Sequence, residues 1–190
     1  MKKIFFILSL TSLFFLLAAN SCRKHKHDVP SELSKLPPET QTGANTFGCL
    51  IDGKAFLPRG SGFGGPVLSC FYIQNTPTEQ GYFLGLSASD KSNTSDVFGI
   101  GIGTDSLQVS IGSYNLIEKK RGNYFAYYLR VNQQGTNQYY TSSKDPGTIT
   151  ITKLDELNQI ISGAFHFNVI TTTNDTLRIT DGRFDIHYTK

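Results

Sequence analysis

The sequence predicts an all-β protein, a single antiparallel β-sandwich of about ten strands, with a closed β-barrel as the alternative. The first reason is composition: charged residues make up 17% of the chain, and the aromatic residues are 14 Phe and 9 Tyr with no Trp. The second is an alternation of apolar and polar residues from Phe47 onward, which is typical of half-buried strands. The third is the spacing of turn signals, roughly every 8–12 residues, without long apolar helical patterns.

The chain opens with a charged and then apolar leader. Two lysines precede a mostly apolar run over residues 4–17, and small residues follow up to Cys22. This anatomy predicts a cleaved lipoprotein signal helix over residues 1–21. Its apolar run is shorter than the roughly 20 apolar residues of a bilayer span. Cys22 would be the first residue of the mature chain and carry the lipid that anchors it in the bilayer. Asn20 is larger than usual at its position, so ordinary secretion is the alternative.

Residues 22–46 are predicted to form a disordered tether. A basic cluster at residues 23–27 follows the lipidation site, and residues 29–43 are rich in proline and polar side chains with little to bury. The basic cluster could attract anionic head groups or simply be solvated. The formal net charge of +3 falls to +1 once the two leader lysines are removed, so no nucleic-acid partner is indicated.

The predicted domain covers residues 47–190 and begins with a hairpin. Two apolar runs flank Asp52-Gly53, a pair that favours a type I′ turn because glycine accepts positive φ. After a Gly-rich loop, further strands are predicted at 67–74, 82–89, 97–103, 113–117, 123–131 and 137–141. In the strand at 97–103, alternating glycines leave one face bare, where another layer or backbone should approach closely.

The last third of the chain carries the clearest strand patterns. Thr and Ile alternate over residues 147–152, and residues 161–169 place their large apolar side chains on one face. Two final strands, 177–180 and 183–188, are predicted to be joined by a turn at Asp181-Gly182.

Two cysteines remain in the domain after Cys22. Cys49 and Cys70 both lie in apolar strand patterns and are expected to be shielded and close together. In an oxidising compartment a disulfide between them would close a loop of about 20 residues and stabilise the fold by roughly 3 kcal/mol. Two buried free thiols are the alternative, since cysteine packs well as a small apolar residue.

The strand at 123–131 holds the best predicted contact surface. Alternation places Tyr124, Tyr128 and Arg130 on one face, with Phe125 and Tyr127 on the other. If the second face is core, the first shows two tyrosines and a guanidinium to solvent, and these residue types are favoured at protein contacts. The alternative is that the tyrosine rings pack on the sheet and only their hydroxyls are exposed to solvent.

No motif indicates a metal or a cofactor. His166 and His187 fall on the polar faces of their strands, but two histidines make a weak metal site. Residues 90–96 carry oxygen side chains at alternate positions without the frame of a calcium loop, and the Gly-rich run at 60–65 lacks the helix of a phosphate cradle. No nucleophile elbow is present, and the adjacent carboxylates Asp155 and Glu156 should point apart.

Five segments are similar to a family of uncharacterised Bacteroidota-type lipoproteins. They are Leu36–Cys49 (LPPETQTGANTFGC), Gly60–Pro66, Ile149–Asp155 (TITKLD at its core), Ile161–Phe165 (ISGAF) and Ile179–Asp185 (ITDGRFD). The resemblance implies an outer-membrane lipoprotein of a Gram-negative cell with no established activity. Members that reach the cell exterior tend to carry acidic residues after the lipidated cysteine. The basic residues 23–26 stand there instead, which favours a periplasm-facing protein.

The function that these observations favour is a non-catalytic binding or structural module of the cell envelope, with an unknown envelope protein or glycan as partner. The alternatives are an envelope hydrolase with an unrecognised site and a glycan-binding accessory protein, although the lack of Trp weakens a stacking site for sugars. Titratable groups with shifted pKa values in a deep cleft would favour the enzyme. A flat aromatic sheet face would favour the binder.

Overall fold

In a computed structural model of the chain, the structure describes residues 31–61, 65–75 and 80–190. Apart from one short 3-10 helix, η1 (Glu32–Lys35), the regular elements of these residues are strands, which confirms the all-β class. Within these ranges, no helix has the length and apolarity to cross a bilayer. The strands are β1 (Thr46–Ile51), β2 (Lys54–Phe56), β3 (Leu68–Gln74), β4 (Tyr82–Asp90), β5 (Asp96–Asp105), β6 (Gly112–Ile117), β7 (Tyr124–Asn132), β8 (Gly135–Tyr140), β9 (Gly147–Asp155), β10 (Ile160–Ile170) and β11 (Thr176–His187).

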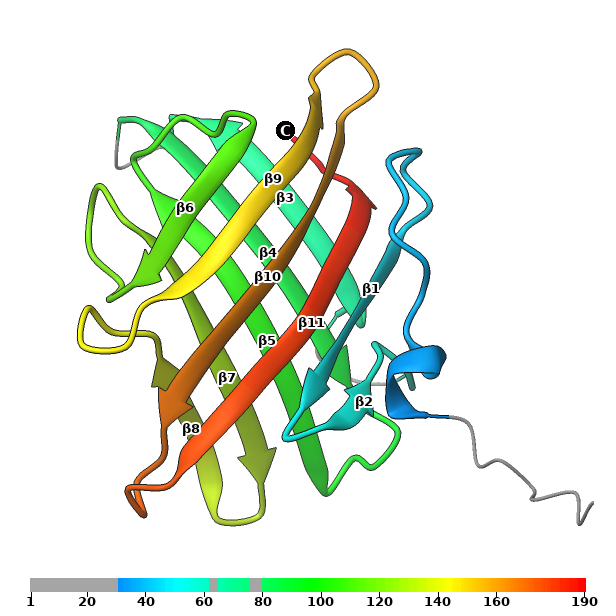
Figure 1. Cartoon of the computed structure of the whole chain (residues 1–190), viewed down its shortest axis with the longest axis vertical. Coiled ribbons are helices and arrows are strands. Elements are labelled where there is room, and N and C mark those ends of the chain that lie inside the picture. Colours follow the sequence, from blue (N-terminus) through cyan, green and yellow to red (C-terminus); the bar gives the residue numbers. More distant parts are fainter. Residues whose placement is uncertain (1–30, 62–64, 76–79) are drawn as a thin grey trace, which may run out of the picture. The chain divides into compact units, whose positions relative to one another are not determined.

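The described strands form one curled sheet with the order β2-β1-β11-β10-β9-β6-β7-β5-β4-β3, and β8 pairs with β7 off this path. Figure 1 shows β6, β9, β10, β11 and β1 crossing in front of β3, β4, β5 and β7. The two halves of the sheet therefore face each other across the core, as the layers of a sandwich do. The pairs are antiparallel except for β6 with β7, which run parallel at Leu116–Ile117.

The curl is drawn together at one end by the segment after β11. Thr189 exchanges backbone hydrogen bonds with β3: Tyr72 N donates to Thr189 O at 2.9 Å, and Thr189 N donates to Cys70 O at 3.0 Å. The chain therefore brings β3, the last strand of the sheet path, beside the residues that follow β11, the third strand from the other end.

The first predicted hairpin is confirmed. β1 and β2 pair directly around Asp52 and Gly53, whose φ angles are 46° and 77°. Two successive residues with positive φ are what a type I′ turn requires.

The predicted turn at Asp181-Gly182 is wrong, because β11 runs through both residues. Asp181 takes a φ of 53°, and the register with β10 shifts by one residue there, so this position is a β-bulge. A Cβ on Gly182 would lie 2.5 Å from the Phe165 ring. The glycine is therefore needed for close packing against β10 rather than for a chain reversal.

The prediction of a disordered tether up to residue 46 is wrong for the described residues 31–46, which belong to the same compact unit as the sheet. Glu32 accepts a hydrogen bond from Ala55 N at 2.8 Å, and Leu36 is buried against β1. Residues 40–44 donate to the buried carboxylate of Asp185 on β11. The docking of this segment could not be predicted from its proline-rich, polar composition, because hydrogen bonds hold it to the domain more than apolar burial does.

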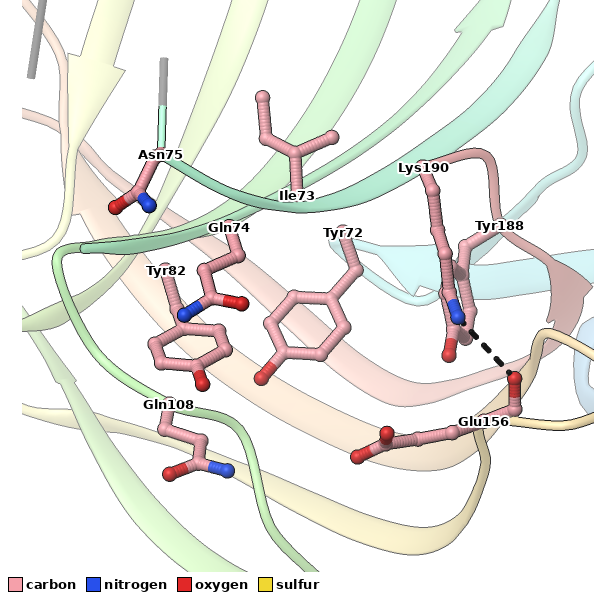
Figure 2. A pocket seen from close by; sticks show the side chains of 9 residues that line it. All are labelled: Tyr72, Ile73, Gln74, Asn75, Tyr82, Gln108, Glu156, Tyr188 and Lys190. Carbon is pink, nitrogen blue, oxygen red and sulfur yellow. Dashed lines mark hydrogen bonds between the residues drawn. The ribbon is translucent and has the colours of Figure 1, made fainter. Parts of the chain in front are cut away.

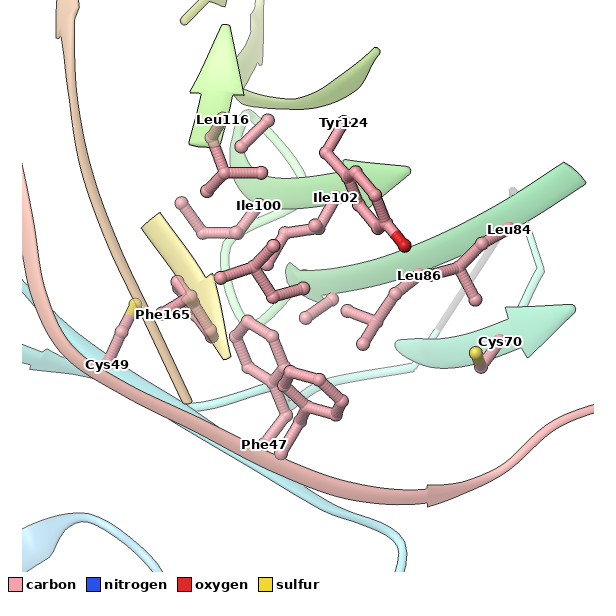
Figure 3. Close-up of a cluster of buried hydrophobic side chains, with 14 of the residues drawn as sticks. Phe47, Cys49, Cys70, Leu84, Leu86, Ile100, Ile102, Leu116, Tyr124 and Phe165 are labelled. Atoms are coloured by element: carbon pink, nitrogen blue, oxygen red, sulfur yellow. The ribbon is translucent and has the colours of Figure 1, made fainter. Parts of the chain in front are cut away.

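The core lies between the two halves of the curled sheet. Strand alternation places Ile149 and Ile151 of β9 inside, both at most 1% exposed, while Thr150 between them faces outward. Figure 3 shows the central cluster, in which Phe47 and Phe165 stack with ring centroids 5.3 Å apart. The alternation predicted for 147–152 is therefore confirmed.

Candidate functional site

A pocket opens at the end of the sheet where Thr189 meets β3, and its volume is about 540 Å³. This volume lies within the range of small-molecule sites. Its walls carry aromatic rings, side-chain amides, a carboxylate and an ammonium (Figure 2). We call it the tyrosine pocket; its lining residues are Tyr72, Ile73, Gln74, Asn75, Tyr82, Gln108, Glu156, Tyr188 and Lys190.

Three tyrosines from separate segments of the chain form the aromatic wall. Tyr72 of β3 stacks on Tyr82 of β4 with centroids 5.9 Å apart, and it meets Tyr188 edge-on at 5.7 Å. Tyr188 directly follows β11, where its N–H donates to Gln159 O at 2.8 Å. Backbone pairing therefore fixes all three rings.

Polar groups are arranged around these rings. Tyr72 Oη accepts a hydrogen bond from Val109 N at 3.0 Å. Tyr188 is only 2% exposed, and its hydroxyl has no hydrogen-bond partner among the described residues. Lys190 extends along Tyr188, and its Nζ lies 3.5 Å from the main-chain oxygen of Glu156 (Figure 2). The pocket thus offers aromatic side chains and the exposed carboxylate side chain of Glu156 to a bound molecule, while the Tyr188 hydroxyl stays buried.

Two of the pocket tyrosines, Tyr72 and Tyr188, have raised pKa values. Burial raises the pKa of Tyr72, and the neighbouring Tyr82 and Glu156 raise it further, against the opposing hydrogen bond from Val109. Burial also raises the pKa of Tyr188, with a second contribution from the Glu156 carboxylate. A phenol with a raised pKa is a hydrogen-bond donor and a poor base or nucleophile at neutral pH. Tyr72 and Tyr188 are therefore poor candidates for a general base or a nucleophile.

The predicted contact face on β7 is wrong for its two tyrosines. Tyr124 is 5% exposed and Tyr128 is 8% exposed, and both belong to the core. Only Arg130 is on the surface, where it forms a bidentate pair with Asp96 at 2.8 and 2.9 Å. The two faces of the strand are reversed relative to the prediction, because aromatic residues occur on both faces and alternation therefore gives no contrast in hydrophobicity.

The two domain cysteines are free and buried, which agrees with the second of the two predicted arrangements. Figure 3 shows Cys49 and Cys70 on opposite sides of the core cluster, so the expectation that they lie close together is wrong. Burial raises the pKa of Cys70 to about 12 and also raises that of Cys49. Both thiols are therefore unreactive apolar side chains in the folded protein.

The predicted metal candidates do not come together. His187 pairs in register with Ile160, whereas His166 lies opposite Thr148, so the two imidazoles are not neighbours. Among the described residues no group of three or more His, Cys, Asp or Glu side chains could hold a metal ion.

The polar turn between β4 and β5 uses its carboxylates internally. Asp90 accepts hydrogen bonds from Arg59 and Ser92, and Asp96 accepts from Arg130. In the Gly-rich run, residues 62–64 lie outside the described part of the chain, as does the predicted lipidation site Cys22.

Sequence reasoning missed the tyrosine pocket because its residues come from five separate segments. The only local signal is Tyr188, which continues the inward-facing series of Phe184 and Ile186 but adds a hydroxyl at the end of the strand. Nothing in the order of residues places Tyr72, Tyr82 or Glu156 beside it.

The family comparison covers the strands that build most of the sheet. Residues 92–185 match the model of a family described as a domain of unknown function, DUF6252. The DUF6252 match begins in the turn before β5 and ends within β11, so it includes β5 to β10 and most of β11. Of the tyrosine pocket it contains Gln108 and Glu156, while the three tyrosines lie outside it. The search of curated proteins finds no match, and the search of solved structures finds none either.

Proposed function

We propose that this chain is a non-catalytic binding module of the cell envelope that captures a small organic ammonium compound in the tyrosine pocket. The observation that supports the proposal is the convergence of Tyr72, Tyr82 and Tyr188 beside the carboxylate of Glu156. Aromatic faces attract cations through their quadrupole, and a carboxylate completes such a cage. The ligand would be anchored to the envelope with the protein, through the lipid on Cys22.

The chain's own Lys190 supports the choice of an ammonium ligand. Its Nζ lies in the pocket, close to the main-chain oxygen of Glu156 and beside Tyr188. A ligand cation would compete with this ammonium beside Glu156. The raised pKa values of Tyr72 and Tyr188 support binding rather than catalysis, because the phenols are kept protonated.

The test compares choline with its neutral carbon isostere, 3,3-dimethylbutan-1-ol, on the mature protein in detergent. The chain has no Trp, so its nine tyrosines supply the fluorescence signal, and the variants described next assign a change in that signal to the pocket. Choline should change the fluorescence saturably, and the isostere should bind at least about tenfold more weakly, since it lacks the charge. Equal binding of the two compounds, or no binding of choline at millimolar concentration, would refute the proposal.

Two variants locate the site. Tyr82→Ala should weaken choline binding roughly tenfold, and Glu156→Gln should weaken it severalfold because an exposed carboxylate contributes modestly. The matched control is Glu39→Gln, which removes an exposed carboxylate elsewhere and should leave the affinity unchanged. Lys190→Met should tighten binding, because it removes a competing cation.

The envelope location has its own test. The leader and Cys22 favour a lipid anchor in the outer membrane of a Gram-negative cell, and the basic residues 23–26 favour a periplasm-facing orientation. The Cys22→Ala protein should leave the membrane fraction and stop incorporating labelled palmitate. Continued palmitate labelling of this variant would contradict the anchor.

A further inference from the structure

The outer surface of the sheet carries a second hollow, which is separate from the tyrosine pocket. It has a volume of about 420 Å³ and lies across β3, β4, β5, β7 and β8. We call it the outer groove. It is lined by Ser69, Phe71, Phe83, Leu84, Gly85, Leu86, Ser87, Ile102, Gly103, Thr104, Asp105, Lys119, Phe125, Tyr127, Gln138 and Tyr140.

Strand register explains why the surface is hollowed there. One row across the sheet pairs Phe71, Gly85, Gly103 and Phe125 in order. The two central strands therefore contribute no side chain to this row, and aromatic rings stand at both ends. Because outward positions recur every second residue, the next outward row lies directly beside it.

The second row pairs Ser69, Ser87, Gly101, Tyr127 and Tyr140. It repeats the arrangement, with small residues on the central strands and rings on β7 and β8. Together the two rows make a shallow trough, and the neighbouring aromatic rings partly cover its glycine backbone.

Aromatic rings lean over the glycines of this trough. The Phe71 ring lies over Gly85, and the Tyr127 ring lies over Gly101, so that a Cβ at either glycine would collide with it. Phe71 is nevertheless 43% exposed, which makes it one of the large exposed apolar side chains of the described domain. The rings thus cover the bare backbone and still present surface to solvent.

Polar groups complete the outer groove. Lys119 Nζ lies 5.6 Å from the centroid of Phe125 and 5.7 Å from that of Tyr140. Asp105 and Gln138 also line it. One cation and one anion leave the lining without net charge, which disfavours a polyanionic ligand.

We propose that the outer groove binds a neutral oligosaccharide chain. Sugar rings present apolar C–H faces that stack on aromatic rings and hydroxyls that bond to ammonium, carboxylate, amide and serine groups, and the outer groove supplies both kinds of partner. The five strands span roughly 19 Å at their usual spacing, which leaves room for about four hexose units. A peptide strand is disfavoured, because the outer groove lies on a face where neighbouring strands already use the backbone hydrogen bonds.

The test titrates the mature protein in detergent with cellohexaose, xylohexaose, maltohexaose and chitohexaose, using tyrosine fluorescence and calorimetry. At least one hexasaccharide should bind, and its monosaccharide should bind far more weakly because it fills only part of the outer groove. No binding by any of the four at millimolar concentration overturns the proposal. Binding of a proline- and tyrosine-rich peptide in their place also overturns it.

Variants assign the binding to this surface. Phe71→Ala should lower the affinity for the hexasaccharide about tenfold or more, as at a contact hot spot. Phe71→Trp should leave that affinity unchanged or raise it. Ile170→Ala is the matched control, because Ile170 is 50% exposed and lies outside the outer groove. If Ile170→Ala lowers the affinity for the hexasaccharide as much as Phe71→Ala does, the assignment to the outer groove is overturned. Glu156→Gln should not affect the saccharide, so failure here and failure of the tyrosine pocket can be told apart.

Discussion

Asp185→Asn is expected to be among the most damaging conservative substitutions in the domain. Asp185 is 1% exposed, and among the described residues its charge is met by hydrogen bonds instead of an ion pair. Its Oδ2 accepts from Thr40 Oγ1 at 2.6 Å, Thr42 N at 2.9 Å and Ala44 N at 3.1 Å. The carboxylate therefore fastens the N-terminal segment to β11.

The hydrogen bonds of the other carboxylate oxygen, Oδ1, set the size of the stability loss in Asp185→Asn. Oδ1 accepts from Gly43 N and from Ser162 Oγ, both at 2.8 Å. In the better of its two orientations, an asparagine would turn its amide NH₂ toward these groups. The serine hydroxyl can rotate to accept, but Gly43 N–H cannot, so one buried donor loses its partner.

The expected loss of stability is about 3–5 kcal/mol. A buried donor left unpaired costs roughly 1–3 kcal/mol, and the remaining bonds lose the strengthening that a charged acceptor gives. For a protein of this size the melting temperature should fall by roughly 10 °C. Urea unfolding of the mature protein in detergent, followed by circular dichroism, measures the change.

Asp181→Asn is the matched control. It makes the same chemical change at an exposed position on the same strand and should alter stability by about 0.5 kcal/mol or less. If Asp185→Asn unfolds at the same urea concentration as the control, the hydrogen bonds between residues 40–44 and Asp185 do not stabilise the fold. That result would refute the prediction.

The same carboxylate gives stability a pH dependence of known sign. Burial alone would raise the pKa of Asp185, but the hydrogen bonds from Thr40, Ala44, Ser162 and Thr42 outweigh it and hold that pKa well below the usual range. A depressed pKa stabilises the fold fully above the unfolded value near 3.9 and loses that effect as the pH falls further. Stability of the wild type should thus decline below about pH 4, and the decline should be smaller in Asp185→Asn.

Three further outcomes follow from burial. Cys49 and Cys70 should resist alkylation in the folded protein at pH 8 and react readily in denaturant without reductant, since both thiols are free and buried; rapid native labelling would contradict this. Tyr128→Ala should lower stability by about 3–5 kcal/mol in urea unfolding, as for a large core side chain, and an unchanged midpoint would return Tyr128 to the surface. Tyr188→Phe should be neutral or stabilising by about 1 kcal/mol in thermal melts, because it removes a buried hydroxyl without a partner among the described residues; a clear loss would show that this hydroxyl is bonded.

The all-β class, the spacing of the strands and the first hairpin could all be predicted from the order of residues. These depend on local chemistry: alternation of apolar side chains selects the strand, and Asp52-Gly53 can adopt the two positive φ angles of the turn. The inward face of β9 was also predictable, because its Thr and Ile differ strongly in hydrophobicity.

Three features depend on packing between distant segments: the inward face of β7, the bulge at Asp181 and the docking of residues 31–46. In β7 both faces are aromatic, so burial depends on which side of the curled sheet the strand joins. The Asp181-Gly182 pair could make a turn or a bulge, and close packing of Gly182 against Phe165 selects the bulge.

The same reason explains why both candidate binding sites escaped the sequence. The tyrosine pocket gathers side chains from five separate segments, and the outer groove depends on glycines and rings aligned across five strands. Strand register brings such residues together, and register is set by pairing between distant segments of the chain.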